Sequence, residues 1–93
     1  MASYTIRIEL HEADWDDYVE MYQHLAAQGI TDIISSDNGV SYKMPPAEYN
    51  YVGSATRAQV LEMAKASAGK VVRSYAVFVT ESNGRKWYGL AEV

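Results

Sequence analysis

The sequence contains no cysteine among its 93 residues. Disulfide bonds, thiol nucleophiles and cysteine-ligated zinc or iron–sulfur centres are therefore excluded, and the chain suits a reducing compartment. Long apolar runs are also missing, since no stretch reaches the roughly 18 apolar residues that a membrane-spanning helix needs. Residues 1–11 lack the cationic start and apolar run of a signal peptide. We expect a single soluble, cytoplasmic domain spanning residues 1–93, with no membrane partner.

Basic residues are scarce. Eight Lys and Arg against twelve Asp and Glu give a net charge of −4, which opposes non-specific attraction to nucleic acid. We therefore expect no DNA partner, and any RNA contact must come from a local patch. The two histidines, His11 and His24, do not have the spacing of a metal-binding helix face, and no glycine-rich phosphate loop is present. The sequence predicts no metal and no cofactor.

Two patterns of apolar residues alternate along the chain. Period-2 alternation over residues 4–10 and 75–80 indicates strands, and shorter strands are expected at 30–35 and 48–52. Residues 14–28 and 57–68 have helical periodicity, and each begins with a capping residue, Asp14 or Thr56. Asn38-Gly39 and Asn83-Gly84 are typical of hairpin turns, and the second predicts a short final strand over 87–93 that returns along its neighbour.

This order of elements predicts an α+β fold. Two amphipathic helices need a common apolar surface, which one antiparallel sheet provides when both helices cover the same face. The expected architecture is a ferredoxin-like βαββαβ sandwich with a short C-terminal hairpin strand added. The residues predicted to share its core are Ile6, Ile8, Trp15, Leu25, Leu61, Val77 and Val79.

Residues 85–88 combine two cations with two aromatic side chains. Arg85 and Lys86 next to Trp87 are the residue types that hold a phosphate and stack a base of single-stranded RNA. The alternative is a charged hairpin tip above a tryptophan of the core, because strands of small domains often carry Trp and Tyr for packing.

A second unusual stretch, YKMPPAEYNYVGS at residues 42–54, contains two adjacent prolines and three tyrosines. Proline has no N–H to donate to a sheet, so pairing must stop at Pro45 and Pro46. We interpret the stretch as a connector whose tyrosines cover apolar surface. A dimer interface is the functional alternative, because tyrosine is enriched at protein interfaces.

The run Gly39-Val40-Ser41-Tyr42-Lys43-Met44-Pro45, followed by Glu48-Tyr49 and by Ser54 ahead of a capped helix, resembles a small bacterial family that includes the GhoS antitoxin. The resemblance covers nearly the whole chain. It implies a ferredoxin-like fold and the activity of an endoribonuclease antitoxin that binds or cleaves single-stranded RNA in a toxin–antitoxin system. Residues 20–24 depart from the family, because arginines of its first helix have no counterpart there.

The resemblance places a carboxylate at Glu9, and we take Arg7 and Glu9 as the candidate catalytic pair. Arg85, Lys86 and Trp87 are the candidate RNA contacts. Two other functions stay open. One is a non-enzymatic, dimeric accessory domain whose exposed strand edges and tyrosines bind a second copy or another protein. The other is a small-molecule sensor with a cleft between the helices and the connector.

Overall fold

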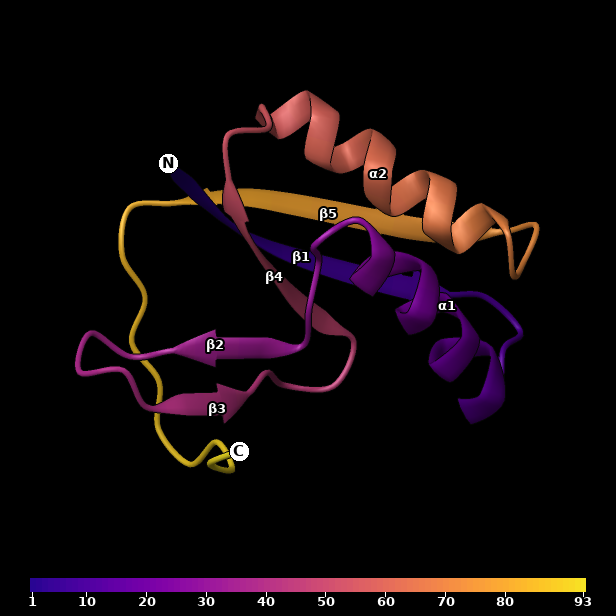
Figure 1. Ribbon diagram of the computed structural model, residues 1–93. Coiled ribbons are helices and arrows are strands. Elements are labelled where there is room, and N and C mark those ends of the chain that lie inside the picture. Colours follow the sequence, from indigo (N-terminus) through magenta and orange to yellow (C-terminus); the bar gives the residue numbers. More distant parts are fainter.

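The computed structural model describes residues 1–93, which form five strands and two helices. Figure 1 shows how these elements are arranged. In chain order the elements are β1 (Ala2–Leu10), α1 (Trp15–Ala27), β2 (Ile33–Ser35), β3 (Ser41–Lys43), β4 (Glu48–Gly53), α2 (Arg57–Gly69) and β5 (Tyr75–Ser82). Neither helix has the length and hydrophobicity that crossing a membrane requires.

The main sheet is antiparallel and has the strand order β4-β1-β5. At its centre Ile6 pairs with Tyr49 of β4 and with Val79 of β5. The alternation of β1 buries one face completely, and both helices pack on that face through their apolar stripes. The residues that form this core are Tyr4, Ile6, Ile8, Leu10, Met21, Leu25, Ile30, Tyr49, Val60, Ala64 and Ala68. The predicted ferredoxin-like α+β arrangement is confirmed.

Both helices begin where the sequence predicts. Asp14 accepts a hydrogen bond from the backbone N–H of Asp17 at 3.0 Å, and Thr56 accepts one from Gln59 at 3.1 Å. In each case the side chain three positions on also accepts a bond from the N–H of the capping residue, so two free donors of the first turn are satisfied. These contacts involve neighbouring residues only, which is why the sequence predicts them well.

Two members of the predicted core lie elsewhere. Trp15 is 76% exposed. It lies about 120° around α1 from the fully buried Met21, so the aromatic ring and the buried stripe occupy different sides of the helix. Leu61 is only partly buried and does not belong to the core cluster. Val77 and Val79 are partly buried and pack against the core as expected.

The predicted hairpin around Asn38-Gly39 forms, but β2 and β3 make a separate small sheet. Gly39 has a φ of +85°, which the turn requires and which glycine adopts without strain. The hairpin is joined to the main sheet at one bridge, where Thr31 and Asn50 exchange backbone hydrogen bonds of 2.9 and 2.7 Å. Pairing stops at Pro45 and Pro46 as predicted, and the stretch 42–54 consists of the end of β3, this break and β4.

The predicted C-terminal hairpin strand is wrong. Residues after Ser82 leave the end of β5 and run past the β2–β3 hairpin, as the yellow segment of Figure 1 shows, and reach β3. There the N–H of Lys43 donates to the carbonyl of Ala91 at 2.8 Å, and the N–H of Val93 donates to that of Ser41 at 2.9 Å. Asn83-Gly84 has the same backbone pattern as Asn38-Gly39, with a positive φ only at the glycine, so the turn itself does not explain the difference. The residues after Asn83-Gly84 take another course because residues 91–93 find their partners on β3 and not on β5.

Candidate functional site

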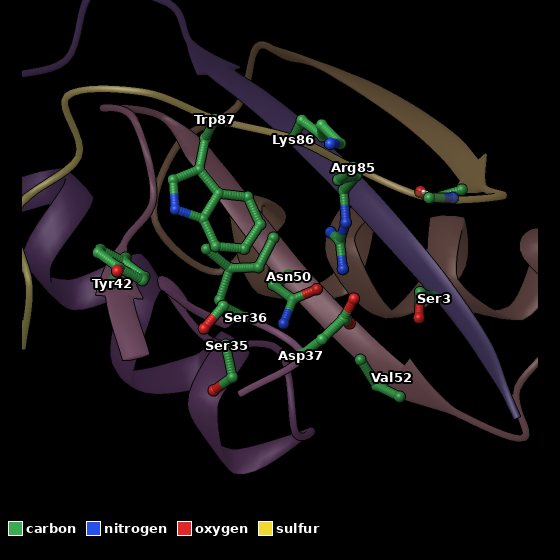
Figure 2. Close-up of a pocket in the computed structure, with 13 residues that line it drawn as sticks. Ser3, Ser35, Ser36, Asp37, Tyr42, Asn50, Val52, Arg85, Lys86 and Trp87 are labelled. Carbon is green, nitrogen blue, oxygen red and sulfur yellow. Dashed lines mark hydrogen bonds between the residues drawn. The ribbon is translucent and has the colours of Figure 1, made fainter. Parts of the chain in front are cut away.

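The side of the main sheet opposite the helices, here called the open face, carries the outward-pointing residues of the three strands. Between this face and the β2–β3 hairpin lies a cavity of about 610 Å³, closed on one side by residues 84–87. We call it the Arg85 cavity. Figure 2 shows Arg85 and Trp87 reaching into it from the C-terminal segment, toward Asn50 and the hairpin.

Arg85 is the central cation of the cavity. One of its guanidinium nitrogens, Nη1, donates to the hydroxyl of Thr5 at 3.1 Å and to the carbonyl of Tyr4 at 3.4 Å, which fixes the side chain over β1. Burial lowers the pKa of the guanidinium, yet no carboxylate forms an ion pair with it. Its remaining N–H groups are the natural donors to an anion, because guanidinium binds carboxylate and phosphate in a two-pronged geometry.

An aromatic wall stands beside this cation. Trp87 packs edge-on against Tyr42 of β3, with ring centroids 5.5 Å apart and an angle of 66° between the planes. The tryptophan is partly buried by this contact and still lines the cavity. Lys86 is exposed at the rim. The three residues predicted as RNA contacts therefore line one cavity, although the hairpin expected to present them does not form.

Asn50 contributes an acceptor without a partner. Its amide nitrogen donates to the carbonyl of Ile33 at 3.0 Å, which fixes the orientation of the amide group. Its oxygen is buried and accepts no hydrogen bond from the protein. A buried acceptor left in this way costs free energy, and because the oxygen has almost no exposed surface it is not within reach of a group in the cavity.

The rest of the cavity is mostly small and polar. Its other polar lining residues are Ser3, Ser35, Ser36, Asp37 and Ser82. Asp37 is the only carboxylate in the lining, so it partly offsets the two cations. Taken together, the cavity offers cations for an anion and an aromatic ring for a flat group.

Arg7 and Glu9, the predicted catalytic pair, lie on the open face but outside this cavity. Each has a different partner: Arg7 forms a 3.4 Å ion pair with Glu48 of β4, and Glu9 lies 3.3 Å from the imidazole of His11. His11 also shares a 2.7 Å hydrogen bond with Ser74. The two candidate residues thus belong to separate contacts on the same strand face.

A second cavity, of about 520 Å³, separates α1 from the proline connector. Its lining is largely apolar and aromatic, including the exposed Trp15 and the buried Tyr49, whose pKa burial raises to about 12. Its charged pair, Lys43 and Asp32, is closed on itself by a 2.7 Å ion pair. This is the cleft that the sensor hypothesis requires, but its charges already satisfy each other.

Sequence reasoning missed Asn50 and the hairpin residues of the Arg85 cavity. The available signal at Asn50 is a polar residue between two tyrosines in a strand, which does not by itself indicate a site. The hairpin serines and Asp37 belong to a turn signal and have no motif of their own. They become part of a site only because the C-terminal segment folds back over them.

Comparison with known proteins does not identify a family. No family model matches the chain, and no curated protein does. The similarity to the GhoS family therefore stays a prediction from the sequence.

Proposed function

We propose that the protein binds single-stranded RNA at the Arg85 cavity. The observation that carries this proposal is a partly buried guanidinium without a carboxylate partner, placed beside an aromatic wall. Burial of the Arg85 guanidinium costs desolvation free energy that no ion pair offsets. A phosphate in the cavity would supply the missing ion pair and offset this cost.

The remaining groups fit one nucleotide of an unpaired strand. A base would stack on the free surface of Trp87, which lines the cavity. Lys86 at the rim would contact a neighbouring phosphate. A base inside a duplex is not free to enter such a cavity, which favours single strands. The net charge of −4 keeps binding dependent on these local contacts.

The resemblance to the GhoS family supports the same ligand. It extends the proposal to an RNA-binding antitoxin of the cytoplasm, in which the cavity would hold a segment of the toxin transcript. A membrane-active toxin encoded next to this protein would support that extension, whereas the RNA-binding proposal itself stands on the cavity.

RNA binding should depend on salt and on Lys86. We expect a fluorescein-labelled single-stranded RNA to bind the purified protein at low salt, and the affinity to fall as salt rises because phosphate contacts release counterions. Replacing Lys86 by Ala should make the slope of log K against log salt shallower by about 0.7, the loss of one phosphate contact on a single strand. Fluorescence anisotropy over a salt series measures the slope.

A matched control is Lys70→Ala, which removes an exposed cation at the end of α2, away from the cavity. It should leave the slope unchanged.

Stacking has an independent readout, because the chain has two tryptophans and Trp15→Phe leaves Trp87 as the only one. Bound RNA should then quench its fluorescence. No RNA binding at low salt, or equal slopes for the two lysine variants, would contradict the proposal.

Cleavage is a separate prediction and rests on the family resemblance. If Arg7 and Glu9 act on a bound phosphodiester, either single Ala substitution should abolish cutting of a labelled RNA in a gel assay. Both side chains are exposed, so the melting temperature should change little. Cutting at an undiminished rate by both variants would remove the catalytic assignment and leave the binding proposal intact.

A further inference from the structure

The two outer strands of the main sheet differ in what covers their edges. The outer edge of β4 is bridged by Thr31, whereas β5 pairs only with β1. None of the 16 backbone hydrogen bonds outside the helices and strands involves a residue of Tyr75–Ser82. Every second N–H and C=O group of this eight-residue strand therefore points outward without a protein partner.

The β5 edge also lacks the features that normally prevent strand pairing. It contains no proline and no lysine, and its only charge is Glu81 near one end. Phe78, in the middle of the strand, is 69% exposed on the open face. A long edge with a single charge near its end and an exposed aromatic residue in its middle favours pairing with another strand.

Apolar surface continues beside this edge on the helix side. Leu61 of α2 is partly exposed and lies about 160° around the helix from Met63. Gln28 caps the C-terminal end of α1, and its side chain donates to the backbone carbonyl of Met63 at 3.0 Å. The flank of α2 that bears Met63 therefore faces α1. Leu61 therefore lies on the flank away from α1, and α2 packs mainly on β5. Its partly exposed side chain adds apolar surface on that flank of α2.

We infer that β5 pairs antiparallel with β5 of a second copy of this chain, so that the two main sheets join into one. The strand is self-complementary when Phe78 is opposite Phe78 of the partner copy, because Val77 then faces Val79 and Glu81 faces Tyr75. No like charges are opposed, and two aromatic rings meet across the strands. A two-fold axis through this point closes the assembly as a dimer, with both open faces on the same side.

A charge test addresses this interface directly. Phe78→Lys places two ammonium groups opposite each other, so the dimer dissociation constant should rise at least about tenfold. Phe78→Glu should do the same. Mixing the two variants should restore a dimer, because opposite charges then meet. Analytical ultracentrifugation over a range of concentrations measures each state, and circular dichroism checks that the variants are folded.

Val19→Lys is the matched control, because it puts the same charge on an exposed apolar position of α1, away from β5. It should dimerise like the unchanged protein. A protein that is monomeric at all concentrations, or a dimer that survives Phe78→Lys, would overturn the inference. RNA binding by a monomer would leave the proposed function standing, so the two proposals fail separately.

Discussion

Replacing Leu25 by Ala should lower the free energy of unfolding by about 2–5 kcal/mol, the usual range for a fully buried leucine. Leu25 has 0% exposure and belongs to the core between α1, α2 and β1. Its carbonyl also accepts the N–H groups of Gln28 and Ile30, which hold the end of the helix, so the surrounding backbone is poorly able to close the cavity. Urea denaturation monitored by circular dichroism measures the change.

Leu61→Ala is the matched control, since it removes the same atoms from the other helix. Leu61 is partly exposed and lies outside the core cluster, so the loss should be less than half that of Leu25→Ala. The comparison belongs at low protein concentration, where any dimer is dissociated. Equal losses would show that the two leucines are buried alike.

Gly53→Ala should destabilise the protein by about 1–3 kcal/mol, because it overfills a packed site. A Cβ atom at Gly53 would meet the hydroxyl of Tyr51 and lie 2.7 Å from its Cζ atom. The ring is not free to move, since it packs against Tyr4 with centroids 6.1 Å apart and its hydroxyl accepts the N–H of Ala55 at 3.4 Å. Thermal denaturation of the two proteins under the same conditions measures the loss.

Gly69→Ala provides the comparison for glycine removal. There the nearest atom to an added Cβ is the Tyr75 hydroxyl at 3.5 Å, an ordinary contact, and the residue is helical. Alanine is favoured over glycine in a helix by roughly 0.5–1 kcal/mol, so stability should stay equal or rise. If both substitutions shifted the melting temperature in the same direction by the same amount, crowding by Tyr51 would not be the cause.

The parts of the fold that could be predicted from the sequence depend on local patterns. The alternation of β1 and the caps at Asp14 and Thr56 involve residues a few positions apart, and the structure confirms them. The course of residues 83–93 depends instead on distant partners, β3 and Tyr42, which no local pattern reveals. A strong hairpin signal was therefore overridden by tertiary contacts.

The candidate site also contains some residues that the sequence predicts and others that only the structure reveals. Arg85, Lys86 and Trp87 are adjacent in the sequence and combine residue types with a clear chemistry, so they could be proposed in advance. The position of Asn50 depends on the bridge between Thr31 and β4, which links residues far apart in the sequence. Its unpaired oxygen is visible only in the structure. Trp15 is the opposite case, because helical periodicity predicts this residue in the core and it lies at the surface.

The backbone contacts between β3 and the C-terminal segment join residues 41–43 to residues 91–93. During synthesis the hairpin is complete long before its last partner emerges, so the wall formed by Trp87 and Tyr42 is absent until that late contact is made. Closing such a long loop costs more chain entropy than closing a hairpin, and contacts of this range slow folding. The Arg85 cavity is thus expected to be among the last parts of the molecule to form, and a nascent chain would lack it even after both helices have docked.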